Sequence, residues 1–237
     1  MEDDILDSYL TSKEQPFAQP AEEASDQPKS YPPKKNTDRI WDSTDIKRVK
    51  PDPSKFVKEG KSYMVMTSTT PPADVVEILN KLITSLATKN FTLRYQFDSL
   101  ISFTKDLSNR ENITKEIYLP WKRMAPDLEN AHMVYPNRPA YEFGVYYAKK
   151  FLSFPPAVRA LRAMTIHTLL GKKCNNPVDF VILWSENGEE KLREDSDFKK
   201  LGNLPNVFSV CSDLNIPMFN IGNKESLTKL VEKIKAL

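Results

Sequence analysis

Apolar residues become dense and regularly spaced only from Tyr63 onward. Short apolar runs predict strands at residues 63–66, 91–95, 116–119, 178–184 and 217–221. Between these runs, apolar residues recur every three or four positions, which is the spacing of one helix face. That spacing predicts helices at residues 75–86, 98–107, 141–152, 156–170, 207–214 and 225–237.

Alternation of short strands with helices is typical of a parallel sheet with crossover helices. We therefore predict an α/β, Rossmann-like domain over residues 56–237. The strand at residues 178–184 is the longest apolar run, so we expect it at the centre of the sheet, where parallel strands are buried on both faces.

The first 55 residues have a different composition. Acidic residues dominate residues 1–30, basic residues dominate residues 31–62, and prolines recur throughout. With few apolar side chains to offset the entropy of ordering, we predict a disordered tail over residues 1–55.

Two small apolar groups interrupt this tail. Ile5, Leu6, Tyr9 and Leu10 have the spacing of one helix face, and Trp41 follows Ile40 in a basic segment. These residues are candidates for binding a protein partner. Composition leaves a second interpretation open, in which the tail is only a solvating, entropic extension.

Several classes of protein do not fit this sequence. No apolar run approaches the roughly 18 residues of a membrane helix, and the acidic N-terminus is unlike a secretory signal. Cys174 and Cys211 are far apart in the sequence, which favours reduced structural residues over a metal site. We expect a cytoplasmic protein (host cytoplasm if viral) without a metal or other cofactor, and a packed role for His167.

Three segments carry a resemblance to a known superfamily: residues 116–121, residues 162–171 leading into 177–184, and residues 215–221. In the order of their predicted segments, residues 63–222 resemble the SLOG superfamily of Rossmann-like domains. The likeness is nearest to the DprA-like (DNA-processing protein A) proteins of bacteria and phages. The resemblance implies a nucleic-acid or nucleotide ligand.

The turns of this chain depart from the glycine-rich pattern of that superfamily. Residues 67–72 and 95–99 follow the first two strands and contain no glycine, and the loop at residues 185–191 is acidic. Side chains and prolines in such turns keep a phosphate away from backbone N–H groups. We therefore expect no nucleotide-hydrolysing or phosphoribohydrolase activity.

Basic and aromatic residues follow two of the predicted strands. The carboxyl ends of parallel strands meet at one edge of the sheet, where open α/β folds bind ligands. Cations beside aromatic rings are typical of single-strand binding, because stacking tolerates any base. The sequence therefore predicts a nucleic-acid-binding rim made of Arg94, Tyr95, Trp121, Lys122, Arg123 and Arg162. The alternative is that Tyr95 is a core residue, Trp121 is half-buried in a solvated loop, and Arg162 lies on a solvated helix face.

The favoured hypothesis is a non-enzymatic protein that binds single-stranded DNA and recruits a polymerase or a recombination factor through its tail. Two alternatives stay open. One is a nucleotide-binding sensor or phosphoribohydrolase, and the other is a structural subunit of a larger assembly.

Overall fold

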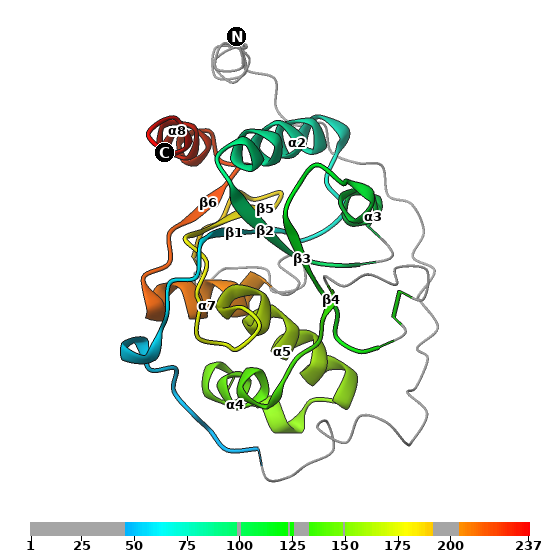
Figure 1. Cartoon of the computed structure of the whole chain (residues 1–237). Coiled ribbons are helices and arrows are strands. Elements are labelled where there is room, and N and C mark those ends of the chain that lie inside the picture. The colour runs from blue at the N-terminus through cyan, green and yellow to red at the C-terminus, as the bar shows by residue number, and fades with distance from the viewer. Residues whose placement is uncertain (1–45, 99–100, 123, 126–132, 149, 192–203) are drawn as a thin grey trace.

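The computed structural model of the chain describes residues 46–98, 101–122, 124–125, 133–148, 150–191 and 204–237. They form three layers, in which one parallel sheet lies between two layers of helices (Figure 1). The predicted α/β, Rossmann-like fold is confirmed.

The sheet has six strands in the order β4-β3-β2-β1-β5-β6, and every neighbouring pair is parallel. The strands are β1 (Lys61–Thr67), β2 (Phe91–Gln96), β3 (Lys115–Tyr118), β4 (Met133–Val134), β5 (Phe180–Trp184) and β6 (Met218–Asn220). The chain adds β2, β3 and β4 on one side of β1 and then returns to add β5 and β6 on the other side. The point where the order reverses is where open α/β sheets bind ligands.

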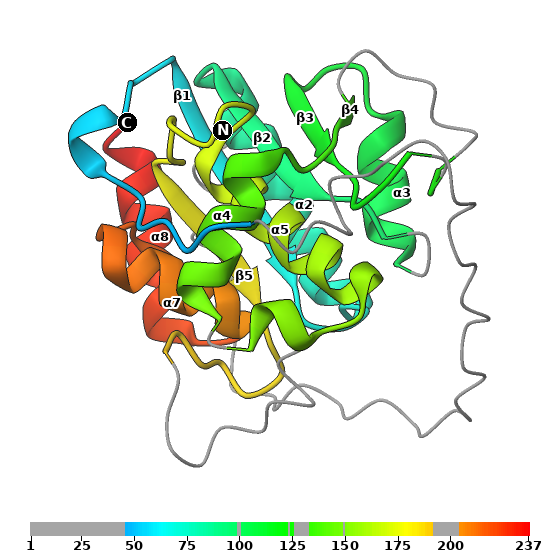
Figure 2. The same ribbon diagram turned by 90° about the horizontal axis from the view of Figure 1, so that it is seen from below.

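One face of the sheet is covered by α2 (Ala73–Thr88), α3 (Ser102–Asn109) and α8 (Lys224–Lys235). The other face is covered by α4 (Arg138–Tyr147), α5 (Pro156–Leu170) and α7 (Leu204–Leu214), which lie in front of the sheet in Figure 2. Two short 3₁₀ turns complete the described elements, η2 (Pro53–Lys55) and η3 (Phe151–Ser153).

Alternation along the strands divides the core between these two layers. In β1, Tyr63 and Val65 pack with the α2, α3 and α8 layer, whereas Met64 and Met66 pack with the α4, α5 and α7 layer. All of these side chains are buried. Successive side chains of a strand point to opposite faces, so a strand covered on both sides reads as a continuous apolar run.

The predicted strands all form, but the predicted position of one is wrong. The run at residues 178–184 contains β5, which lies between β1 and the edge strand β6 rather than at the centre. Helices cover both faces of β5. Its apolar composition therefore indicates burial on both faces and not a central position among the strands. The two-residue strand β4 was too short to produce a pattern in the sequence.

The predicted helix over residues 141–152 also ends early. Regular α4 stops at Tyr147, and the chain turns so that Phe151 packs directly against Gly144. A Cβ at Gly144 would lie 2.4 Å from the Phe151 ring, so this close approach depends on glycine.

The folded part begins before the predicted boundary at residue 55. Ile46 is buried against the α4, α5 and α7 layer, and the Val49 N–H donates to the Glu142 carbonyl at 3.4 Å. Farther along, the Val57 N–H donates to the Asn175 carbonyl at 2.8 Å. Residues 46–55 therefore belong with the domain. Residues 1–45, which include the candidate partner-binding residues Ile5, Leu6, Tyr9, Leu10 and Trp41, lie outside the described residues.

Candidate functional site

Arg94 is not part of an exposed rim. Its side chain is buried, its Nε lies 2.9 Å from Glu116 Oε2, and its Nη1 donates to the Asn176 carbonyl at 2.7 Å. Glu116 is the second residue of β3, and Arg94 lines a hollow with Ser62 and Thr92 near the starts of β1 and β2, so it is directed toward the amino ends of the strands. The prediction that Arg94 contacts nucleic acid at the carboxyl edge is therefore wrong.

Tyr95 is a core residue, as the alternative interpretation proposed. It is only 1% exposed and packs with Leu93 and Phe97 in the layer of α2, α3 and α8. A base cannot stack on a ring that has no accessible face, so the predicted stacking role of Tyr95 is also wrong.

The Arg94–Glu116 cluster is a buried polar network at the amino edge of the sheet. Glu116 also accepts a hydrogen bond from the Tyr118 hydroxyl at 2.8 Å, and Lys172 Nζ lies 3.4 Å from it. The ring of Tyr118 packs edge-on against His167, with 5.3 Å between the centroids. These contacts join β2, β3 and the C-terminal end of α5, which indicates a structural role for the cluster.

His167 is held neutral inside this network. Its Nε2 lies 2.9 Å from the Lys172 carbonyl and donates to it, which assigns the ring proton to Nε2. Nδ1 is buried and has no hydrogen-bond partner among the described residues. Burial lowers the pKa of His167 to about 4, and the positive charge of Arg94 acts in the same direction. The predicted packed role of His167 agrees with this environment.

Gly171 makes room for the Arg94 guanidinium. It follows α5 with φ 77° and ψ 176°, a backbone conformation that is essentially restricted to glycine. A Cβ here would lie 3.0 Å from Arg94 Nη2 and 3.1 Å from the Asn176 carbonyl oxygen.

We expect Gly171→Ala to lower the free energy of unfolding by about 2 kcal/mol, because it combines backbone strain with crowding of Arg94. Urea unfolding measures the change, with Gly60→Ala as the control. Gly60 also has a positive φ, but nothing lies within 4 Å of its Cβ position. If the two variants lose equal stability, the close approach to Arg94 adds nothing.

Trp121 and Lys122 lie where the sequence predicted, directly after the carboxyl end of β3. Trp121 is half-buried and Lys122 is exposed. The next predicted rim residue, Arg123, lies outside the described residues. Trp121 and Lys122 thus remain candidates for contact with a ligand at this edge.

Arg162 also reaches the carboxyl side of the sheet. The N-terminal half of α5 packs on the ends of β3 and β4, where Met164 and Leu161 contact Tyr118 and Val134. The Arg162 guanidinium lies over the Phe154 ring at 4.4 Å, and its Nη1 donates to Asn206 Oδ1 at 2.8 Å.

One turn earlier, Arg159 is half-buried like Arg162. We call Arg159 and Arg162 the arginine pair. No carboxylate in the described part of the chain forms an ion pair with either residue. Both Nε atoms are buried without a hydrogen-bond partner there.

The start of α5 adds to this positive charge. The helix begins at Pro156 without a side-chain cap, and its first turn contains no acidic residue. The N-terminus of a helix carries a partial positive charge, so Arg159 in the first turn of α5 is unfavourable there unless an anion is bound. Arg162, one turn later, adds a second positive charge. The arrangement therefore favours a phosphate or another anion.

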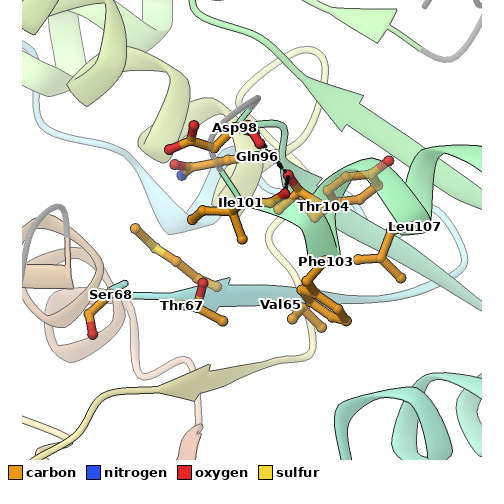
Figure 3. Close-up of a pocket in the computed structure, with 11 residues that line it drawn as sticks. Val65, Thr67, Ser68, Gln96, Asp98, Ile101, Phe103, Thr104 and Leu107 are labelled. Carbon is orange, nitrogen blue, oxygen red and sulfur yellow. Dashed lines mark hydrogen bonds between the residues drawn. The ribbon is translucent and has the colours of Figure 1, made fainter. Parts of the chain in front are cut away.

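A cavity of about 170 Å³ opens at the carboxyl ends of β1 and β2, beside α3, and we call it the edge cavity. Figure 3 shows the polar groups of Ser68, Gln96 and Asp98 toward one end and Val65, Phe103 and Leu107 toward the other. Its wall includes Thr104, whose hydroxyl donates to the Asp98 carbonyl at 2.7 Å and accepts from the Asp98 N–H. These bonds fix the turn that leads from β2 into α3.

The described residues that line the edge cavity offer nothing to hold a phosphate. They include one carboxylate, Asp98, and neither a cation nor a glycine. Among the described residues, no three potential ligand side chains come together as a metal would require. Of these two features, the arginine pair is therefore the better candidate for a phosphate contact.

Sequence reasoning missed the buried ion pair and the edge cavity. A signal for the first existed, because Arg94 stands between Leu93 and Tyr95 in an apolar strand, where a lone charge needs a buried partner. The cavity depends on how Ile101 and Phe103 of one turn meet the end of β1, and no local pattern contains that information.

Within the described part of the chain, no helix has the length and apolar character needed to cross a bilayer. No protein-family model, curated protein or solved structure matches this chain. The DprA-like resemblance therefore stays a prediction. The strand order establishes only a doubly wound, Rossmann-like α/β fold.

Proposed function

We propose that this protein binds single-stranded DNA at the carboxyl edge of its sheet, without catalysing a reaction. The observation that carries the proposal is the arginine pair. Two half-buried guanidinium groups lie at an uncapped helix N-terminus, with no acidic partner in the described part of the chain. Polyanions satisfy such a group of positive charges, and phosphate contacts supply most of the affinity for a nucleic-acid backbone.

The aromatic residues on this side of the sheet favour a single strand over a duplex. Phe154 lies under the Arg162 guanidinium, and Trp121 follows β3 on the same side of the sheet. A half-exposed ring can stack only on a base that is not already stacked and paired in a duplex. The proposed DNA-binding surface therefore consists of Trp121, Lys122, Arg159 and Arg162, with Phe154 as support.

The N-terminal tail supplies the second part of the proposal. Its apolar groups suit a docking peptide for a polymerase or a recombination factor, which the DNA-bound domain would bring to exposed single strands. Ile46, the first described residue, is buried against the layer of α4, α5 and α7.

A titration with labelled oligomers tests the proposal. We expect single-stranded DNA to bind at least tenfold more tightly than a duplex of the same length at low salt, as measured by fluorescence anisotropy. A single-stranded RNA arm tests the choice of DNA, since stacking and phosphate contacts alone do not distinguish the two sugars. Equal affinity for duplex and single strand would contradict the proposed role of the aromatic residues, and a lack of binding would remove the function itself.

A further inference from the structure

The guanidinium of Arg162 is held by two side chains that belong to different parts of the fold. The centre of the Phe154 ring, just before α5, lies 4.4 Å from the guanidinium carbon, and Asn206 Oδ1 of α7 accepts a hydrogen bond from Nη1 at 2.8 Å. Asn206 is itself buried, so its amide has little freedom to leave this position. Arg162 is therefore fixed in place although it is only half-buried.

Both contacts orient the arginine without neutralising it. An amide oxygen and an aromatic ring each attract a cation but carry no net charge. Burial lowers the pKa of Arg162, and no carboxylate in the described part of the chain forms an ion pair with it. A guanidinium has five N–H donors, of which the bond with Asn206 uses one. The arginine therefore keeps its charge, and further donors, for an anion.

We propose that Asn206, supported by Phe154, is a positioning residue that holds Arg162 in place for a phosphate of the DNA strand and, being neutral, leaves the arginine charge to the ligand. This inference rests on the proposed function. A mobile arginine loses rotamer freedom when it binds a ligand, which weakens the affinity, whereas an arginine already held in one arrangement loses less. The competing explanation is that the bond between Arg162 and Asn206 serves only to tie α5 to α7.

Asn206→Asp separates these explanations, because it keeps the size of the side chain and the acceptor oxygen but adds a counter-charge. In the parent, a phosphate neutralised by Arg162 contributes about 0.7 to the slope of log K against log salt for a single strand. In the variant the new carboxylate neutralises Arg162 instead, so we expect a slope shallower by about 0.7. Extrapolated from 1 M salt, this difference corresponds to roughly eightfold weaker binding at about 50 mM salt, as measured by fluorescence anisotropy on the full-length protein.

Two controls make this result specific to Arg162. Ser212→Asp adds the same charge at an exposed position of α7 and should leave the slope nearly unchanged, because solvent and salt screen it. In an Arg162→Gln background, Asn206→Asp should not lower the slope further, because the cation that it neutralises is gone. Urea unfolding of each variant shows whether the fold is retained.

Asn206→Ala provides a second variant, which removes the acceptor without adding a charge. If Asn206 positions Arg162, this variant binds single-stranded DNA about fivefold more weakly at low salt, with the slope of the parent, because Arg162 is still present. The inference is overturned if neither variant changes the affinity or the slope although Arg162→Gln changes both. A parent that does not bind, or whose binding is unaffected by Arg162→Gln, would contradict the proposed role of the arginine pair as well, so the two failures are distinguishable.

Discussion

Glu116→Gln is expected to lower the free energy of unfolding by about 3 kcal/mol. The substitution leaves the Arg94 guanidinium buried without a counter-charge, and loss of one partner of a buried ion pair has effects of this size. The same change removes the charge that holds Lys172 and weakens the acceptor of the Tyr118 hydroxyl. Urea unfolding gives the difference directly.

Two further variants make this prediction specific. Glu225→Gln removes the same charge from an exposed ion pair with Lys229 and should change stability little, because solvent screens that pair. The double variant Arg94→Met/Glu116→Leu should be more stable than Glu116→Gln, because it leaves no buried charge unpaired. If the double variant is instead the least stable, the cluster stabilises the fold through the charges themselves.

The second large effect is a loss of stability in mild acid that depends on His167. Burial lowers the pKa of this residue from 6.5 to about 4, so between these values the unfolded chain binds a proton that the folded chain does not. The stability contributed by neutral His167 is therefore complete above pH 6.5 and is lost as the pH falls toward 4. The expected decrease is about 2 kcal/mol between pH 7 and pH 5, and about 3 kcal/mol over the whole interval.

Urea unfolding at pH 7, 6 and 5 measures this slope above the range in which carboxylates ordinarily titrate. His167→Gln should remove most of it, whereas His132→Gln, at the other histidine of the chain, should retain it. A slope that survives in His167→Gln would assign the acid sensitivity to other groups.

The fold could be predicted from the sequence because its signals are local. The run from Val178 to Trp184 and the periodic apolar residues of α2 each identify an element without knowledge of its neighbours. The order of the strands is a different kind of property. β5 and β1 are both covered by helices on two faces, so their composition is similar although their positions in the sheet differ.

Two residues of the predicted site, Arg94 and Tyr95, are buried, whereas the edge of the sheet on which the site was placed stays a prediction. Chain topology alone predicts the positions of Trp121, Lys122 and Arg162. Residues that directly follow a parallel strand, or that begin the helix before the next strand, lie on the carboxyl side of the sheet. Whether Arg94 and Tyr95 are exposed depends instead on the direction in which each side chain points from its strand. Both belong to β2, and the pairing of Arg94 with Glu116 could be found only from the register of β2 with β3.

The salt dependence of single-strand binding tests the central claim most directly when the parent is compared with Arg159→Gln/Arg162→Gln. Each phosphate that a cation neutralises contributes about 0.7 to the slope of log K against log salt for a single strand. We predict that the double variant binds more weakly at low salt, with a slope shallower by about 1.4. The control Lys229→Gln, which removes an exposed cation from α8 on the opposite layer, should leave both quantities unchanged. Equal slopes for the parent and the arginine variant would contradict the account, because they would show that no phosphate rests on the arginine pair.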